Sequence, residues 1–171
     1  MATTQTGTQR SQTPETQTQK ITTFLWYDGN AEEAVNFYTS VFKNSKTNNI
    51  VRYGESGPGA KGSVMIIEFE LDGQQFTAIN GGPAFKFTEA ISLVVNCANQ
   101  EEVDYYWEKL TGDGGQEVVC GWLKDKYGLS WQIVPVRLFE LMEDPTKSDK
   151  VMAAVMEMKK LNLSKLEEAA K

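Results

Sequence analysis

The chain has 171 residues, of which 40% are hydrophobic, so it is long enough for one domain with a hydrophobic core. Its formal net charge of −6 argues against binding nucleic acid or anionic lipid through a basic face. Histidine is absent, which removes the commonest metal ligand and the commonest general base at neutral pH. No apolar run approaches the roughly 18 residues of a membrane span, and the polar N-terminus lacks a secretion signal, so we expect a cytoplasmic protein without membrane contact.

Residues 1–20 are mostly Thr, Gln, Ser and Gly, a composition that cannot bury apolar surface and that predicts a flexible polar tail. The remaining residues, 21–171, are expected to form a single domain. Cys97 and Cys120 are too few for a disulfide framework and lack metal-ligand spacing, which indicates two reduced thiols.

The first half of the chain predicts one helix among four strands. Asn30 and Glu33 have the spacing of a capping box at the start of the helix, and Asp72-Gly73 is typical of a type I′ hairpin turn. The glycine-rich segment 54–62 is expected to be a loop between two strands. The strands are expected at 21–27, 46–53, 63–71 and 75–80, with the helix after Asn30.

The second half repeats this order. A strand at 90–96 is followed by a helix that Asn99 caps, again with Glu at the third position, Glu102. Further strands are expected at 117–123 and 129–134. Helices are then expected at 137–142, 148–160 and 163–170, the last with Ser164 and Glu167 as a capping box, and they would cover a sheet edge or a dimer seam.

The two halves also share a sequence pattern. Asn30-Ala-Glu-Glu-Ala-Val-Asn-Phe-Tyr38 is answered by Asn99-Gln-Glu-Glu-Val-Asp-Tyr-Tyr-Trp107, and an apolar run precedes each copy. The repeated order, one helix and several hairpin-like strands per half, favours an α+β fold over a doubly wound α/β fold. We therefore predict two βαβββ modules, at about 21–82 and 88–135, followed by C-terminal helices at 136–170.

Three segments resemble the PhnB-like family of the glyoxalase, bleomycin-resistance and vicinal oxygen chelate superfamily, whose members often carry the description 3-demethylubiquinone-9 3-methyltransferase. The segments are 24–38, 68–76 and 120–135, and the last is the most specific, with Asp125, Gly128, Trp131, Gln132 and Pro135. The resemblance covers about 21–170. It implies paired βαβββ modules that form a cupped mixed sheet, and usually a homodimer.

Metal-using members of this superfamily place four His, Glu or Gln ligands on the first and last strands of each module. The resemblance puts those positions here at Thr23, Asn80, Ala90 or Ser92, and Gln132, of which only Gln132 is a plausible ligand type. Because a catalytic divalent metal needs about three good protein ligands, we expect neither a metal nor another cofactor.

The methyltransferase description meets a similar difficulty. Binding of S-adenosylmethionine is typical of a doubly wound sheet with a glycine-rich turn after the first strand. Here that strand ends in Asp28-Gly29 without a following G-x-G, and the glycines of 54–62 lie between two strands rather than before a helix.

A ligand pocket is the stronger hypothesis. In the family geometry Thr23, Leu25 and Tyr27 face the cup, whereas Phe24 and Trp26 lie under the helix. By the same alternation Ser130 and Gln132 face the cup, and Trp131 and Ile133 face the core. The neutral hydrogen-bonding groups around an apolar hollow would be Thr23, Asn80, Ser92 and Gln132, which either bind a small organic ligand or satisfy one another or ordered water.

Other side chains have two readings each. Arg52, Tyr53 and Trp122 would close the mouth of the cup, with Arg52 either clamping an anionic ligand or paired at the surface. Glu68 is either a desolvated base in the cup or an exposed carboxylate. We expect a homodimeric small-molecule-binding protein of unknown ligand that does not bind nucleic acid. The alternatives are an enzyme, namely a methyltransferase or a lyase or isomerase that uses Glu68 or Tyr27, and a purely structural role.

Overall fold

The computed structural model describes residues 19–171, so residues 1–18, which make up most of the expected polar tail, lie outside the described part. The first module contains β1 (Thr23–Tyr27), α1 (Ala31–Val41), β2 (Lys46–Arg52), β3 (Val64–Leu71) and β4 (Gln74–Asn80). The second module contains β5 (Leu93–Cys97), α2 (Gln100–Thr111), the short 3-10 turn η1 (Gly112–Gly114), β6 (Gln116–Glu117), β7 (Trp122–Lys124) and β8 (Ser130–Pro135). Three helices follow: α3 (Val136–Met142), α4 (Ser148–Met156) and α5 (Leu163–Ala169).

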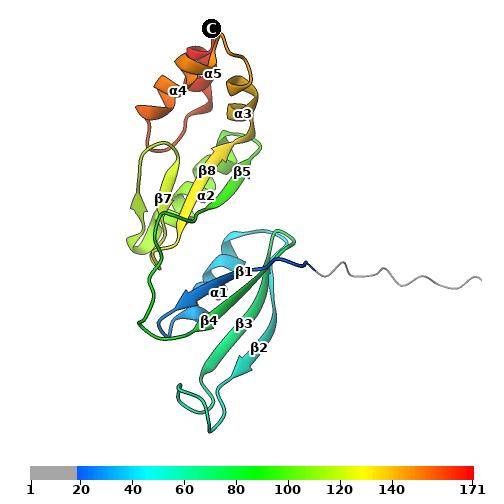
Figure 1. Cartoon of the computed structure of the whole chain (residues 1–171). Coiled ribbons are helices and arrows are strands. Elements are labelled where there is room, and N and C mark those ends of the chain that lie inside the picture. The colour runs from blue at the N-terminus through cyan, green and yellow to red at the C-terminus, as the bar shows by residue number, and fades with distance from the viewer. Residues whose placement is uncertain (1–18) are drawn as a thin grey trace, which may run out of the picture.

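Each module forms its own four-stranded mixed sheet (Figure 1). The strand orders are β1-β4-β3-β2 and β5-β8-β7-β6, so the first strand of each module runs parallel to its last strand and lies at one edge. The remaining pairs are antiparallel. The predicted α+β fold with two βαβββ modules is confirmed, and the glycine-requiring Asp72-Gly73 turn has positive φ at both residues, as a type I′ turn demands.

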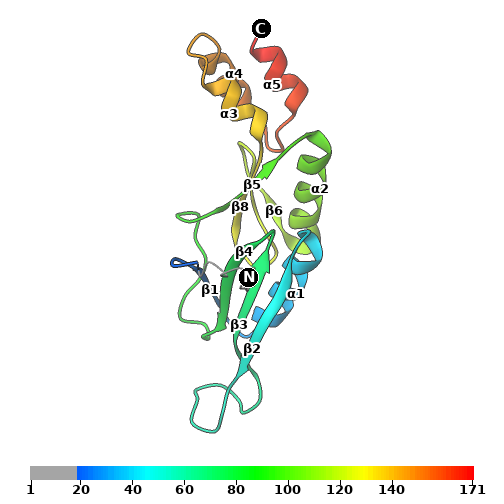
Figure 2. The same cartoon turned by 90° about the vertical axis from the view of Figure 1, so that its right-hand side faces the viewer.

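Both long helices cover the same side of the molecule. Helices α1 and α2 lie behind the two sheets in Figure 1 and to their right in Figure 2. Large side chains of both modules fill the space between these helices and the sheets, for example Ile67 and Phe69 beside α1 and Leu110 in α2. No helix of residues 19–171 covers the opposite side, which we call the open face.

The two modules meet through aromatic side chains. Phe42, just after α1, stacks between Tyr106 and Trp131 of the second module, with ring centroids 5.1 and 5.3 Å apart and interplanar angles of 20° and 21°. The hydroxyl of Tyr105 also donates to the carbonyl of Val41 at 3.0 Å. Among residues 19–171 no strand of one sheet pairs with a strand of the other, so side-chain contacts of this kind join the modules.

A buried carboxylate reinforces the junction. Asp125, in the β7–β8 turn, is 3% exposed and accepts four hydrogen bonds. The donors are the Tyr38 hydroxyl at 2.7 Å, the Trp131 indole at 2.8 Å, and the backbone N–H groups of Tyr127 and Leu129 at 2.9 and 3.0 Å. Since Tyr38 belongs to α1, the bond between Tyr38 and Asp125 links the first module to the β7–β8 turn of the second.

Two of the three predicted helix caps are wrong. The Asn30 side chain makes no capping bond, and Glu33 instead accepts from the Tyr127 hydroxyl at 2.8 Å. The first N–H of α1, that of Ala31, donates to Asn80 Oδ1 at 2.9 Å. Asn99 does cap α2, with its side chain accepting from the N–H of Glu102.

The C-terminal region differs from expectation at its boundaries. Helix α5 is capped by Asn162, which accepts from the N–H of Lys165, so Ser164 lies inside the helix. Helix α4 ends at Met156 rather than 160. The expected strand 117–123 is interrupted, because Cys120 and Gly121 turn with positive φ and bond to the carbonyls of Met158 and Lys159. Those bonds attach the helices, which bury a separate cluster around Leu141, Val151 and Leu166.

In residues 19–171 no helix combines the length and the apolar character that crossing a bilayer requires.

The two cysteines differ in accessibility. Cys97 is 0% exposed, and burial together with the charge of Glu102 raises the pKa of its thiol to about 12, whereas Cys120 is half-buried. We therefore expect iodoacetamide at about pH 8 to alkylate Cys120 in the folded protein and both cysteines after unfolding, since only an accessible thiolate reacts. Peptide mass spectrometry checks this, and native-state labelling of Cys97 before Cys120 would contradict it.

Candidate functional site

The orientation expected for β1 is wrong. Leu25 and Tyr27 are 5% and 3% exposed and point into the core beneath α1, where the Tyr27 hydroxyl donates to that of Tyr38. Phe24, 54% exposed, lies on the open face instead, with Trp26 in the same alternation. Alternation alone defines the two sets of residues but not which set faces the helix. The hydrogen bond between the buried hydroxyls of Tyr27 and Tyr38 shows which set faces the helix, and that contact is visible only in the structure.

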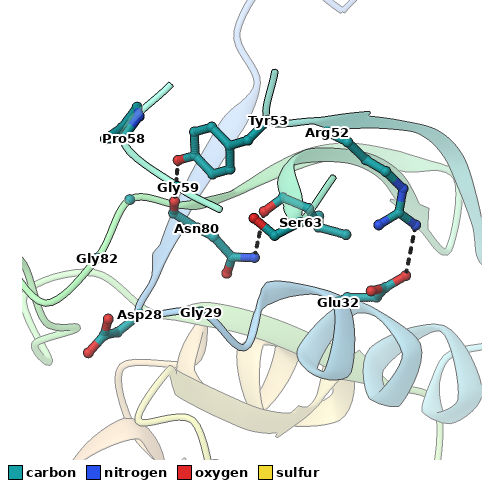
Figure 3. A pocket seen from close by; sticks show the side chains of 12 residues that line it. Asp28, Gly29, Glu32, Arg52, Tyr53, Pro58, Gly59, Ser63, Asn80 and Gly82 are labelled. Carbon is teal, nitrogen blue, oxygen red and sulfur yellow. Dashed lines mark hydrogen bonds and ion pairs between the residues drawn. The ribbon is translucent and has the colours of Figure 1, made fainter. Parts of the chain in front are cut away.

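A cavity of about 440 Å³ lies at the start of α1 (Figure 3), and we call it the helix-start cavity. It is bounded by the turn after β1, the end of β2, the start of β3 and the end of β4. It brings together two predicted site residues, Arg52 and Asn80, and also Tyr53, which was expected at the mouth of the cup. The remaining lining residues are Asp28, Gly29, Glu32, Pro58, Gly59, Ser63, Val64, Gly81 and Gly82.

Asn80 is fixed on both sides of its amide. Its oxygen accepts from the N–H of Ala31, its Nδ2 donates to the Val64 carbonyl at 3.0 Å, and its own carbonyl accepts from the Tyr53 hydroxyl at 2.7 Å. The parallel pairing of Tyr27 with Asn80 puts this amide beside the start of α1. Asn80 therefore builds the wall of the cavity, and beyond these two bonds its amide retains one acceptor lone pair and one N–H donor.

Tyr53 forms the roof with the glycine-rich loop folded over it. A Cβ placed on Gly59 would lie 2.3 Å from the Tyr53 ring, and one on Gly57 would lie 2.6 Å away. The loop can approach the ring this closely only because these positions lack a side chain. The predicted loop at 54–62 is thus confirmed, and the structure gives its glycines a packing role.

Charges gather at the rim of the cavity. The Arg52 guanidinium lies 3.8 Å from the Glu32 carboxylate and donates to the Gly62 carbonyl at 3.2 Å, and its side chain is 51% exposed. Asp28 adds a second carboxylate to the lining. With two carboxylates and one guanidinium, the rim suits a neutral polar or zwitterionic molecule better than a bare anion.

Three predicted residues come together elsewhere, on the open face of the second sheet. Gln132 donates to the Ser92 hydroxyl at 2.8 Å and is paired across the strands with Trp122. This pair matches the expectation that the polar groups satisfy one another. Thr23 is half-buried at the start of β1, and Glu68 is exposed on the open face of the first sheet, so the plainer reading of Glu68 fits.

The residues do not fit a metal of the kind used by relatives. Gln132 is bonded to Ser92, and Asn80 is occupied on both sides. Within the described part of the chain, no three His, Cys, Asp or Glu side chains gather at metal-binding distance. They fit S-adenosylmethionine no better, since the three-residue connection 28–30 joins β1 to α1 in place of a glycine-rich turn and the sheet is mixed rather than doubly wound.

The buried titratable groups serve the junction. Burial raises the pKa of Tyr27, and burial also raises the pKa of Asp125 although four donors oppose the shift. Tyr27 also borders another hollow, of about 320 Å³, near Phe87 and Lys124, but its hydroxyl is directed at Tyr38. A tyrosine with a raised pKa is a poor base at neutral pH.

Comparison with known proteins identifies the family. The family model described as 3-demethylubiquinone-9 3-methyltransferase matches residues 19–134. The chain is 45% identical to the PhnB protein from Bacillus cereus, with a TM-score of 0.64, over 69% of this chain and 100% of that one. A protein from Pseudomonas aeruginosa shares the fold at 19% identity and a TM-score of 0.57, over 68% of this chain and 96% of that one. No curated protein matches. The chain therefore belongs to the PhnB-type 3-demethylubiquinone-9 3-methyltransferase family.

Proposed function

We propose that this chain binds a small neutral or zwitterionic organic molecule in the helix-start cavity and releases it unchanged. The observation that supports the proposal is the convergence of Arg52, Tyr53 and Asn80 on one hollow of about 440 Å³. The bonds of Asn80 and the loop over Tyr53 hold the walls in place before a ligand arrives, which lowers the entropic cost of binding.

The placement of the acids and bases favours binding over turnover. The two carboxylates of the cavity, Asp28 and Glu32, lie at its exposed rim rather than in a desolvated centre. Two groups were considered for acid–base chemistry. The Tyr27 hydroxyl is hydrogen-bonded to Tyr38, and Glu68 is exposed on the open face. Methyl transfer, the activity in the family description, remains the alternative.

Native mass spectrometry of freshly purified protein tests the proposal. We expect an adduct of small mass on the wild type, and the Arg52→Gln variant should lose it because the single cation of the rim is removed. Arg137→Gln, which changes an exposed ion pair in α3, is the matched control and should keep the adduct. Absence of any adduct, together with no thermal shift by a panel of amino acids and their amides, would overturn the proposal.

Recovery of the bound molecule separates binding from catalysis. After incubation with excess protein the molecule should return with its mass unchanged, with or without S-adenosylmethionine. A gain of about 14 Da in the presence of S-adenosylmethionine, which replaces one hydrogen by a methyl group, would instead establish the methyltransferase alternative.

We further propose a homodimer in which a second copy covers the open face. That face carries an apolar row across the first sheet, including Val51, 38% exposed, and it also exposes Phe24 and, on the second sheet, Val94 at 47%. The row consists of Val51, Ile66, Ile79 and Trp26, which are paired across the four strands, and a contiguous apolar patch is typical of an interface. Light scattering should give twice the chain mass for the wild type and the monomer mass for Phe24→Glu/Val94→Lys. A monomeric wild type would refute the dimer.

A further inference from the structure

A second cavity lies at the junction of the modules and shares no lining residue with the helix-start cavity. This junction cavity has a volume of about 540 Å³. The β3–β4 turn of the first module forms one side, and the edge strand β5 with the first two turns of α2 forms the other. Because both modules contribute walls, a molecule bound there would contact both at once.

The charged groups of the junction cavity are of one sign. Asp72 in the β3–β4 turn and Glu102 in α2 line it, and neither Lys nor Arg does. Burial and the charges of Glu102 and Asp72 raise the pKa of Tyr106, another lining residue. Among residues 19–171 the Tyr106 hydroxyl has no hydrogen-bond partner, so it is free to contact a ligand beside two carboxylates.

Aromatic rings supply the apolar part of the wall. Phe42, Phe76, Tyr106 and Trp131 all line the cavity, and Tyr106 is the most accessible of these rings, because Phe42, Phe76 and Trp131 are only 8%, 5% and 2% exposed. Aromatic rings attract an organic cation through their negative faces, and nearby carboxylates add direct charge attraction. A hollow of this size accepts a molecule of about ten to twenty non-hydrogen atoms.

We propose that the junction cavity is a binding site for an organic cation, an ammonium group attached to a flat apolar body. The ammonium group lies between Asp72 and Glu102, and the apolar body rests against the Tyr106 ring. The site is separate from the helix-start cavity, so this proposal and the proposed function can be disproved independently of each other.

The negative charges of Asp72 and Glu102 can be removed by substitutions that keep the local structure. Asp72 has a φ of 46°, which Asn adopts readily, so Asp72→Asn keeps the type I′ turn. Glu102 accepts from the N–H of Ala98 at 2.8 Å, and Gln at this position keeps a carbonyl acceptor. Glu101→Gln, one residue away on α2 and outside the cavity, removes one carboxylate as Glu102→Gln does and is the control for that single variant.

The experiment titrates benzyltrimethylammonium, benzyl alcohol and phenylacetate into ¹⁵N-labelled protein and follows backbone amide shifts by NMR. We expect the cation to bind at least about tenfold more tightly than the other two, with shifts at the β3–β4 turn and β5. Asp72→Asn/Glu102→Gln should weaken cation binding at least about tenfold. Glu102→Gln alone should also weaken it, and its control Glu101→Gln should leave it unchanged.

Three outcomes would overturn the proposal. The first is no saturable binding of benzyltrimethylammonium to the wild-type protein. The second is an equal loss in the Glu101→Gln control, which would indicate attraction by the overall negative charge. The third is binding whose shifts map to Arg52, Tyr53 and Asn80 instead, which would place the cation in the helix-start cavity.

Discussion

Replacing Asp125 by Ala is expected to lower the free energy of unfolding by about 3–5 kcal/mol, because it strips the acceptor from four donors at once. Tyr38 and Trp131 are 0% and 2% exposed, so their donors cannot turn to water. A buried donor left without a partner costs about 1–3 kcal/mol. Urea denaturation followed by tryptophan fluorescence gives the difference directly.

Two further variants make the Asp125 prediction specific. Asp125→Asn keeps one carbonyl acceptor but turns an amide N–H₂ toward a donor, so its loss should fall between the wild type and Asp125→Ala. Glu108→Ala, an exposed carboxylate of α2, should stay within about 0.5 kcal/mol of the wild type. A loss below about 1 kcal/mol for Asp125→Ala would show that the junction does not depend on this carboxylate.

Phe42→Ala is expected to be of similar size, about 3–5 kcal/mol, for a different reason. Phe42 is 8% exposed and fills the space between the rings of Tyr106 and Trp131. Its truncation leaves a cavity there and removes both stacking contacts. Phe139→Ala removes the same atoms from a side chain that is 52% exposed and should cost much less. Equal losses for the two variants in urea denaturation would contradict an ordered aromatic stack.

The sequence predicted best what is decided locally. The Asp72-Gly73 turn and the Asn99 cap depend on a few neighbouring residues, and both form as expected. The repeat of helix and strands was also sufficient for the fold class, because each sheet is built from one half of the chain.

The errors arose where distant residues decide. Asn30 is the local choice for the cap of α1, but parallel pairing of β1 with β4 brings Asn80 closer to the first N–H. The facing of β1 depends on Tyr38 meeting Tyr27 across the core. The junction cavity gave no signal in sequence, because its walls come from turns, strands and a helix of both modules.

The separation of the two sheets has a consequence for how the chain folds. Every hydrogen-bonded strand pair joins residues of the same half of the chain. Forming either sheet therefore costs only the entropy of closing loops within that half. We expect the two sheets to nucleate independently and Phe42 and Asp125 to dock afterwards. The strand register of each half can then change during evolution without affecting the other half. The residues that must change together are those at the contacts between the modules.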